Sequence, residues 1–283
     1  MSFMRSTQAM PRPFLKWAGG KRQLLDALLK QAERANPFTQ YHEPFVGGGA
    51  LFFELRRMNR LEGKQAFLSD TNSRLIDAYL AVRQDVERVI DLLKVHASNH
   101  SEEYYYKVRS QSPQELCAKA ARIIYLNKTG YNGLFRENSK GEFNVPYGRY
   151  KNPCICDEEN LRAVSCALTD THIEARSFET VLDYARKGDF VYFDPPYHPV
   201  SKTSSFTRYS MHGFGPADQE RLAETALKLH KRGVKVLLSN SMTPFIRSLY
   251  RENFHIGKVM ASRQINSNAE KRGQIAEALV RSY

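Results

Sequence analysis

The chain lacks a long hydrophobic run, because no stretch of it approaches the roughly 18 uninterrupted apolar residues of a membrane span. Its amino terminus has no hydrophobic segment of the kind that signal peptides carry. Cysteine is scarce, with 4 residues in a chain of 283. In a protein without an export signal, these cysteines are expected to be reduced thiols. The sequence therefore predicts a cytoplasmic protein with no membrane partner.

Spacings typical of metal sites and nucleotide-phosphate sites are also missing. Cys154 and Cys156 are separated by one residue, which is not the usual zinc spacing, and His172 has no partner histidine at ligand spacing. We therefore expect no metal. The chain has no G-x-G-x-x-G loop of dinucleotide-binding folds, and its Gly-Lys pair is followed by Arg22 where a P-loop requires Ser or Thr. The lack of Ser or Thr after the Gly-Lys pair excludes a P-loop.

The charge balance is basic. The chain has 42 Lys and Arg against 30 Asp and Glu, a formal net charge of +12 and a pI of about 9.5. Such an excess favours a polyanionic partner, with nucleic acid as the leading candidate. Many soluble proteins carry a basic balance for solubility, so charge alone leaves the partner open. Apolar residues make up 42% of the chain, which is enough to fill the core of a large domain.

Strand-like and helix-like patterns alternate along most of the chain. The strand patterns cover residues 41–45, 65–70, 171–175, 190–194 and 234–239. The helical patterns cover residues 22–35, 50–57, 72–82, 178–185 and 216–232. This alternation predicts an α/β fold with a parallel sheet. Two late strands, at 255–260 and 275–281, are joined by a polar loop and are expected to form an antiparallel pair.

A long helical stretch interrupts the alternation. Residues 85–127 have helical patterns without an intervening strand. Residues 128–151 are rich in Gly, Asn, aromatic residues and Arg, which suits a loop or hairpin better than a core. We interpret residues 71–155 as a lobe inserted into a sheet domain that comprises residues 1–70 and 156–283.

The most informative motif is Asp194-Pro195-Pro196-Tyr197, directly after the apolar strand at 190–193. Open α/β sheets bind their ligands at the carboxyl ends of such strands. The prolines lack backbone donors and stiffen the chain, which leaves free carbonyl groups beside the carboxylate. Such a cluster accepts hydrogen bonds from an amino group, and Tyr197 offers a flat face to a base. The alternative is a Pro-rich turn with a surface Asp.

Three further segments indicate a cofactor site. The glycines at 47–49, between a strand and a helix, let a ligand approach the backbone closely, although glycine also serves ordinary tight turns. Asp70 ends the next strand, where nucleoside cofactors have their ribose hydroxyls bound; the alternative is that Asp70 caps the following helix. Trp17 lies between two lysines before a helix and is either part of the site or a core residue.

Together, these segments resemble the motifs of the Dam-type DNA adenine methyltransferases. The matching segments are F-L-K-W-A-G-G-K at 14–21, P-F-V-G-G-G at 44–49, S-D-T-N at 69–72, G-Y-N-G-L-F-R at 130–136, F-N-V-P-Y-G-R-Y-K-N-P at 143–153 and D-P-P-Y at 194–197. Their order is similar to that of the family's alpha group. The resemblance implies a Rossmann-like class I methyltransferase sheet, mostly parallel with an antiparallel late strand, and a DNA-recognition role for the inserted helical and hairpin lobe.

The resemblance also implies S-adenosylmethionine as cofactor and double-stranded DNA as partner. The positions that match cofactor-binding residues are Trp17, Lys21, Phe45, Gly47, Gly49, Asp70, Ser177, Phe178 and Asp194. The positions that match DNA-binding residues are Lys16, Tyr131, Asn132, Leu134, Arg136, Pro146 and Tyr150. By this resemblance, Arg136 reads guanine O6 and N7, Lys16 contacts another guanine, and Tyr131 and Asn132 lie beside a flipped adenine.

The catalytic assignment falls on Asp194, Pro195 and Tyr197. Asp at the first position of the tetrapeptide, in place of Ser or Asn, favours adenine N6 as the target in this family. Asp194 and the Pro195 carbonyl would accept the two amino hydrogens and localise the nitrogen lone pair, while Tyr197 stacks on the flipped base. Direct in-line transfer requires neither a cysteine nucleophile nor a metal.

The resemblance thus implies methyl transfer to adenine N6 in double-stranded DNA, in the site GATC. Two alternatives stay open: the same chemistry on another DNA sequence or on RNA, and a non-catalytic DNA-binding protein on the same fold. We expect a monomer, with two copies on one palindromic site as the alternative. Membership of a restriction-modification system is left open. Residues 201–215 suit a loop that orders over the site, and residues 262–272 suit either a phosphate contact or a solvated hairpin tip.

Overall fold

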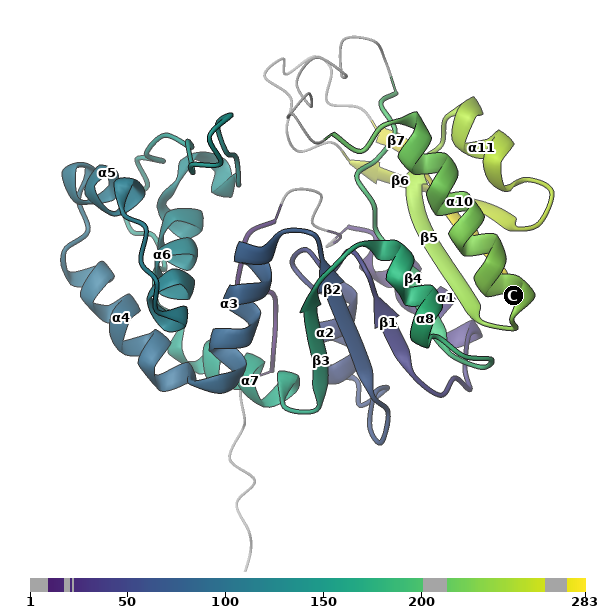
Figure 1. Ribbon diagram of the computed structural model, residues 1–283, viewed down its shortest axis with the longest axis horizontal. Coiled ribbons are helices and arrows are strands. Elements are labelled where there is room, and N and C mark those ends of the chain that lie inside the picture. The colour runs from purple at the N-terminus through teal and green to yellow at the C-terminus, as the bar shows by residue number, and fades with distance from the viewer. Residues whose placement is uncertain (1–9, 18–20, 22, 201–212, 263–273) are drawn as a thin grey trace, which may run out of the picture. The chain divides into compact units, whose positions relative to one another are not determined.

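The structure is a computed structural model that describes residues 10–17, 21, 23–200, 213–262 and 274–283. The sequence-based predictions for the loop at 201–215 and the hairpin tip at 262–272 fall almost entirely outside the described residues. The chain forms two compact units (Figure 1). The helical unit takes residues 1–20, 47–62 and 72–175, and the sheet unit takes residues 21–46, 63–71 and 176–283.

Six described strands belong to the sheet unit. They are β1 (Tyr41–Glu43), β2 (Ala66–Asp70), β4 (Phe190–Phe193), β5 (Lys235–Ser241), β6 (His255–Ser262) and β7 (Gln274–Arg281). Their order across the sheet is β2-β1-β4-β5-β7-β6. The pairs β1–β2, β1–β4 and β4–β5 are parallel, whereas β7 runs antiparallel to both β5 and β6. The predicted α/β class, with a parallel sheet and an antiparallel late pair, is confirmed.

The central strand β4 is apolar at all four positions and buried at all four. A parallel strand in the middle of a sheet is covered on both faces, so a continuous apolar run is stable there. Phe190 pairs with Tyr41 of β1 on one side and with Lys235 of β5 on the other. The carboxyl end of β4, which Asp194 follows, therefore lies at the middle of one sheet edge.

The helices of the sheet unit are α1 (Leu25–Arg34), α8 (Val181–Tyr184), α10 (Pro216–Lys231) and α11 (Pro244–Tyr250), with a 3-10 turn, η2 (Phe178–Thr180), before α8. Along α10, Leu222, Ala226 and Leu229 recur at i, i+4 and i+7 and form one apolar face. These residues are fully buried in a core that includes β4 and β5 side chains. Figure 1 shows α10 lying along β5.

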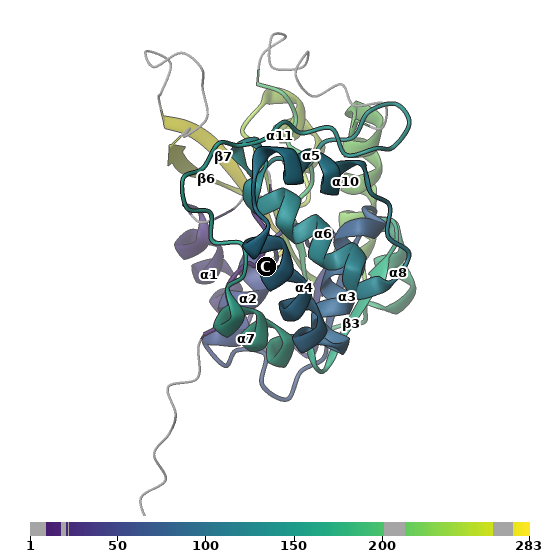
Figure 2. The same cartoon turned by 90° about the vertical axis from the view of Figure 1, so that its left-hand side faces the viewer.

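The helical unit contains α2 (Ala50–Arg57), α3 (Ser73–Gln84), α4 (Val86–Ser98), α5 (Glu102–Ser110), α6 (Leu116–Thr129), the 3-10 turn η1 (Tyr131–Gly133), α7 (Glu158–Leu168) and β3 (Thr171–Ala175). The helix α6 packs against α3, α4 and α5 (Figure 2) and is buried over most of its length. On either side of η1, isolated bridges join Gly130 to Tyr147 and Glu137 to Phe143. The helical stretch and the hairpin-like segment that follows it are both as predicted.

Two helices, α7 and α11, were not expected from the sequence. The pattern of α7 is nonetheless present, because Leu161, Val164 and Leu168 recur at i, i+3 and i+7 and are all buried. The helix α11 has only seven residues and begins with Pro244, so its pattern is too short to separate from a turn. The strand β1 ends at Glu43, two residues earlier than predicted. All four cysteines are free thiols, as predicted.

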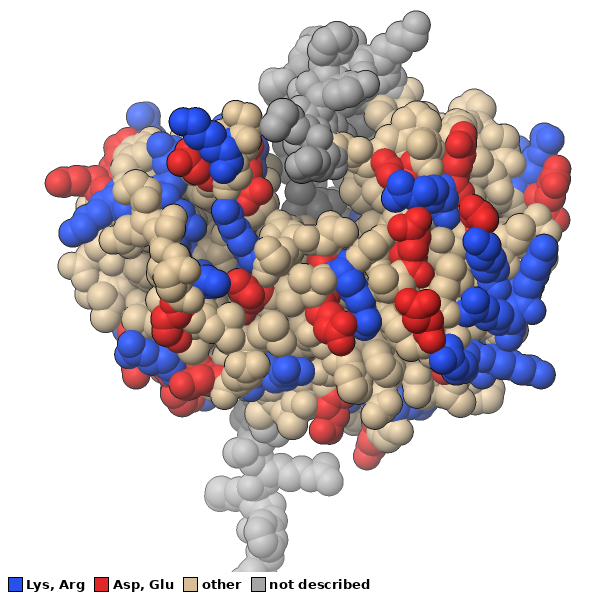
Figure 3. All heavy atoms as spheres, viewed as in Figure 1, with Lys and Arg blue, Asp and Glu red and all other residues tan. Residues whose placement is uncertain are grey.

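Basic and acidic side chains are interspersed on the face shown in Figure 3. Basic side chains gather at the C-terminal end of α10, whose last turn carries Lys228, His230 and Lys231. Cations at this end of a helix interact favourably with the helix dipole. The positive charge at this end of α10 therefore has a local structural role and does not by itself mark a nucleic-acid surface.

Replacing Asn72 with Ala should destabilise the protein by about 1 kcal/mol, the usual cost of losing a helix N-cap. The side-chain oxygen of Asn72 accepts hydrogen bonds from the backbone N–H groups of Arg74 and Leu75, both at 3.1 Å, at the start of α3. Denaturant unfolding measures the change. Ser73→Ala, at an exposed neighbouring position, is the control and should stay within about 0.5 kcal/mol. Equal stabilities of Asn72→Ala and the parent protein would contradict the cap.

Candidate active site

Asp194 lies at the carboxyl end of β4, and its side chain is only 20% exposed. Its Oδ1 lies 2.7 Å from Nζ of Lys21, which is itself buried, and accepts a hydrogen bond from Oγ of Ser239 at 2.9 Å. Burial raises the pKa of Asp194, while the Lys21 ammonium and the Ser239 hydroxyl oppose that rise. The ion pair therefore favours a carboxylate that can accept hydrogen bonds in a poorly solvated site.

Tyr197 is held from two directions within the sheet unit. Its hydroxyl donates to Oε2 of Glu277 at 2.8 Å, and the Lys21 ammonium lies 4.6 Å from the centre of its ring. Burial raises the pKa of Tyr197 well above its usual value, so the ring stays a neutral phenol at ordinary pH. Burial also raises the pKa of Glu277, against the opposing effects of Tyr197 and Lys21. The Lys21 ammonium thus interacts with the carboxyl groups of Asp194 and Glu277 and with the ring of Tyr197.

A buried polar network supports the Asp-Pro-Pro-Tyr turn. Nε2 of Gln219, on α10, donates to the Pro196 carbonyl at 2.9 Å, and Nδ2 of Asn240, on β5, donates to Oε1 of Gln219 at 3.0 Å. The backbone N–H of His198 donates to Oδ1 of Asn240 at 3.0 Å. The expectation that both proline carbonyls are free was therefore wrong for Pro196, whose carbonyl accepts a hydrogen bond from a helix packed behind it.

Sequence reasoning missed Ser239, Asn240, Gln219 and Glu277. A pattern in the sequence of β5 could have revealed Ser239 and Asn240. The apolar run there changes to Ser239-Asn240-Ser241, and all three residues are buried. Polar side chains inside a central strand need partners, so such a change indicates a network or a site. Gln219 and Glu277 carry no comparable local pattern.

Three segments meet at the carboxyl ends of β1 and β2 within the sheet unit. The N–H of Val46 donates to the Ser69 carbonyl at 2.9 Å, and the N–H of Arg176 donates to the Asp70 carbonyl at 3.1 Å. The rings of Phe45 and Phe178 stack with their centres 5.3 Å apart. The Ser177 hydroxyl donates to Glu179 at 2.9 Å. Of the predicted cofactor residues, this edge brings together Phe45, Asp70, Ser177 and Phe178.

The glycine loop requires glycine at two positions in the helical unit. Gly47 and Gly49 have φ values of +47° and +66°, a region that other residues rarely adopt. A Cβ atom on Gly47 would lie 2.9 Å from Cδ1 of Trp17, and one on Gly49 would lie 2.8 Å from the hydroxyl of Tyr79. Trp17 is half-buried and packs against the loop, so it is not simply a core residue.

The N-cap of α3 tests whether Asp70 caps this helix or is a candidate ligand for a cofactor ribose. The capping side chain is that of Asn72, two residues later. Asp70 is the last residue of β2 and does not provide this cap. The alternative in which Asp70 caps the helix is therefore wrong, and its carboxylate sits at a sheet edge.

A buried side chain, Asn127, binds the backbone of Lys16, one of the predicted DNA-binding residues. Its Oδ1 accepts from the Lys16 N–H at 2.7 Å, and its Nδ2 donates to the carbonyls of Lys16 and Gly133 at 2.6 and 3.0 Å. The Lys16 ammonium lies 4.7 Å from the ring centre of Tyr150. Asn127 thus joins the first motif to the segment that begins at Tyr131, more than 100 residues later.

The exposed side chains of this segment include Tyr131, Asn132, Arg136 and Pro146. Tyr131 donates its N–H to the Pro146 carbonyl at 2.9 Å, and the Leu134 N–H donates to the Tyr131 carbonyl at 3.2 Å. These bonds close the base of the hairpin-like segment, so its predicted contact residues occupy neighbouring positions.

Arg136 is oriented by Asn144 across the same segment. Nε of Arg136 donates to Oδ1 of Asn144 at 2.7 Å, and Nη2 donates to the Asn144 carbonyl at 3.1 Å. A guanidinium has five N–H donors, so the end formed by Nη1 and Nη2 keeps donors for a further bidentate contact.

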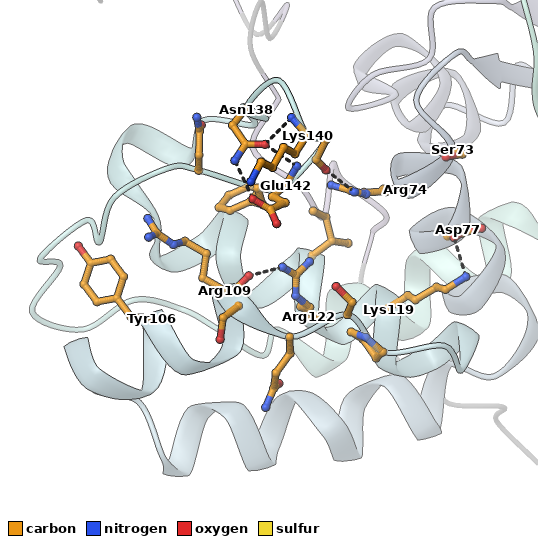
Figure 4. A pocket seen from close by; sticks show the side chains of 18 residues that line it. Ser73, Arg74, Asp77, Tyr106, Arg109, Lys119, Arg122, Asn138, Lys140 and Glu142 are labelled. Carbon is orange, nitrogen blue, oxygen red and sulfur yellow. Dashed lines mark hydrogen bonds and ion pairs between the residues drawn. The ribbon is translucent and has the colours of Figure 1, made fainter.

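A pocket of about 650 Å³ lies beside this segment in the helical unit (Figure 4). Its lining includes Arg74, Arg109 and Arg122. Arg122 donates to the Val108 and Arg109 carbonyls at the end of α5, and Arg109 donates to the Val145 carbonyl at 3.2 Å. Arg74 pairs with Glu137 and donates to the Gly141 carbonyl at 2.5 Å. Arg74 and Arg109 therefore hold the hairpin-like segment in place, whereas Arg122 binds the end of α5. None of the predicted contact residues lines the pocket.

Within the described ranges, no group of three or more His, Cys, Asp or Glu side chains is arranged to hold a metal ion. In the same part of the chain, no helix combines the length and apolarity required to cross a bilayer.

Comparisons with known proteins agree on one family. Residues 17–265 match the sequence family described as D12 class N6 adenine-specific DNA methyltransferase. The type II methyltransferase M.MjaIII of Methanocaldococcus jannaschii is 46% identical over 290 residues, with 96% of this chain and 99% of that protein covered. M1.LlaDCHI of Lactococcus lactis subsp. cremoris, also a type II methyltransferase, is 42% identical over 291 residues, with 100% and 99% covered. A DNA adenine methylase of Escherichia coli K12 is 36% identical over 273 residues, with 95% and 94% covered.

Replacing Lys21 with Met should raise the pKa of Asp194 further, because the cation that opposes the effect of burial is removed. Carboxyl 13C NMR titration measures that pKa. A raised folded-state pKa costs stability as pH rises through it, so the variant should lose most stability near neutral pH, on the order of 3 kcal/mol, and less in acid. Lys30→Met, at an exposed position on α1, is the control. An unchanged Asp194 titration in Lys21→Met would refute the ion pair.

Proposed function

Because the chain belongs to the D12 class of N6 adenine-specific DNA methyltransferases, we propose that it methylates adenine N6 within GATC, with S-adenosylmethionine as donor, after flipping the base out of the duplex. The observation that carries this proposal is Asp194 at the carboxyl end of β4, fixed by Lys21 and Ser239 beside a neutral Tyr197. This arrangement is suited to an amino group next to a flat ring.

The chemistry of the amino group explains the need for a carboxylate acceptor. The lone pair of adenine N6 is delocalised into the ring, so the nitrogen is a poor nucleophile. Asp194 and the Pro195 carbonyl accept the two amino hydrogens, which localises the lone pair on the nitrogen. Methyl transfer from a bound sulfonium would leave a neutral thioether that keeps the carbon–sulfur electron pair, and the methylated nitrogen, positive at first, would release one proton to water. Asp194 stabilises that charge and need not be a strong base.

Tyr197 stacks on the flipped base. Its hydroxyl bond to Glu277 and the Lys21 ammonium near its ring fix the ring plane before any base arrives. A ring that is already ordered loses little entropy when a base stacks on it. The raised pKa of Tyr197 keeps the ring uncharged, so no anion competes with Asp194 for the amino hydrogens.

The donor supplies an electrophilic methyl group on a sulfonium. In the sheet unit, we assign its binding to Lys21, Phe45, Asp70, Ser177, Phe178 and Asp194, which lie at the carboxyl ends of β1, β2 and β4. In the helical unit, we assign it to Trp17, Gly47 and Gly49. Two observations support the fit: the half-buried indole of Trp17 packs on the glycine loop, and Asp70 is the last residue of β2 and does not cap α3.

DNA reading is assigned to Lys16, Tyr131, Asn132, Leu134, Arg136, Pro146 and Tyr150, and residues 71–155 to the recognition lobe. The exposure of Tyr131, Asn132 and Arg136 supports contact with an outside partner. The Asn144 bonds to Arg136 support a bidentate contact with guanine O6 and N7, since two adjacent guanidinium nitrogens keep donors. We propose that the enzyme acts as a monomer.

Labelled methyl transfer to duplexes with GATC or a scrambled site tests the proposal. N6-methyladenine only in the GATC duplex is the expected result, and Asp194→Ala should abolish transfer while DNA binding persists. Methylation of the scrambled duplex would keep the chemistry and overturn the site. Residual transfer near the parental rate by Asp194→Ala would overturn the role of the carboxylate.

Arg136→Ala should cost about 1–3 kcal/mol of discrimination and relax the preference at one guanine. The measurement is kcat/KM on GATC and on duplexes with each guanine replaced in turn. Lys140→Ala, at an exposed position of the same segment, is the control and should leave the ratios between duplexes unchanged. An Arg136→Ala enzyme with the parental ratios would disprove the assignment.

A further inference from the structure

The two oxygens of Asp194 have different surroundings. Oδ1 receives both the Lys21 ammonium at 2.7 Å and the Ser239 hydroxyl at 2.9 Å. Among the residues that the structure describes, no donor to Oδ2 is found. An ionised carboxylate has about four acceptor positions, and donors on one oxygen leave those of the other available. Oδ1 of Asp194 is therefore held by two donors, whereas Oδ2 is available to accept hydrogen bonds from a ligand.

Ser239 lies in the middle of a hydrogen-bonded chain. Its Oγ is 3.0 Å from the Tyr192 hydroxyl and 2.9 Å from Oδ1 of Asp194. A serine has one hydroxyl hydrogen, and an ionised carboxylate only accepts, so that hydrogen points to Asp194. Tyr192 must then donate to Ser239. The donors in this series of hydrogen bonds all point the same way, from Tyr192 through Ser239 to Asp194, and each hydrogen bond polarises the next.

The hydrogen-bonded series from Tyr192 to Asp194 is carried by two paired strands. Tyr192 and Ser239 are 1% and 0% exposed, so water does not replace either bond. They belong to the adjacent strands β4 and β5, which pair in parallel through Tyr192 with Leu237 and Phe193 with Leu238. The Lys21 ammonium, in contrast, is carried on a flexible four-carbon stem. Of the two donors to Oδ1, Ser239 is the one whose position the sheet fixes.

We propose that Ser239 is a positioning residue that holds Oδ1 of Asp194 and thereby reserves Oδ2 for the amino group of the target base. The inference rests on the proposed function, since it takes Asp194 as the acceptor of the amino hydrogens. The torsion that turns a carboxylate is broad and roughly two-fold, so the carboxylate needs a fixed donor to keep one oxygen forward. Ser239 provides that donor without contacting the base.

Ser239→Ala should lower kcat by roughly 10- to 100-fold, the range expected for a misplaced reacting group, with little change in KM for DNA or the methyl donor. The acid limb of the kcat profile should move to higher pH, because the Ser239 bond lowers the pKa of Asp194 and its loss lets that pKa rise. A merely structural hydroxyl would leave this limb where it is in the parent. An unchanged kcat and acid limb in folded Ser239→Ala would overturn the inference.

Ser239→Cys is the conservative variant, nearly the same size and with a weak S–H donor. It should have an intermediate kcat, and it keeps the test decisive if Ser239→Ala does not fold. Equal losses in the Cys and Ala variants would count against a hydrogen-bonding role. Tyr192→Phe removes only the outer bond of the chain, so its loss of kcat should be smaller than that of Ser239→Ala; an equal loss would indicate general damage to the strand pair.

Thr225→Val is the matched control. Thr225 is also buried, and its hydroxyl donates to a backbone carbonyl of its own helix at 2.9 Å, away from the site. It should keep the parental kcat and pH profile despite losing a buried hydroxyl. An inactive parent protein would overturn the proposed function. An active parent with a fully active Ser239→Ala variant would overturn only the role of Ser239.

Discussion

The desolvation of one carboxylate sets the requirements for the rest of the sheet unit. Asp194 follows a strand that is buried at every position, so its charge has lost most of the water that would stabilise it. Lys21 supplies the opposite charge, and Ser239 supplies a fixed hydrogen bond. Lys21 is in turn confined by the Tyr197 ring and by Glu277. Lys21 and Ser239 are buried, and together they provide the charge and the hydrogen bond that the carboxylate of Asp194 needs.

The sequence predicted the parts of this site that are continuous along the chain. The apolar strand before Asp194, the glycine loop and the helix at residues 50–57 each have a local pattern, and all three occur where expected. Ser239 and Glu277 belong to other strands, 45 and 83 positions beyond Asp194, and only strand pairing reveals that Ser239 meets Asp194 and that Glu277 meets Tyr197. Lys21 was assigned to the cofactor from the sequence, and its ion pair with Asp194 was not anticipated.

The helical unit follows the same division between local and long-range information. Residues 130–147 could be recognised as a hairpin-like segment from their composition. The attachment of that segment could not be recognised, because Asn127 joins Lys16 to Gly133 from the last turn of a helix whose other buried residues are mostly apolar. Likewise, Asn144 shows no pattern of its own, although its side chain and carbonyl decide which edge of Arg136 is available.

Trp17 touches two parts of the helical unit that serve different ligands in the proposed enzyme. On one side, its indole ring packs against Gly47 so closely that a Cβ atom there would lie 2.9 Å away. On the other side, its ring centre is 5.3 Å from that of Phe135, the residue before Arg136. In the proposed enzyme, a single indole would therefore be shared between the loop assigned to the donor and the aromatic ring next to Arg136, so that a substitution at Trp17 would disturb both.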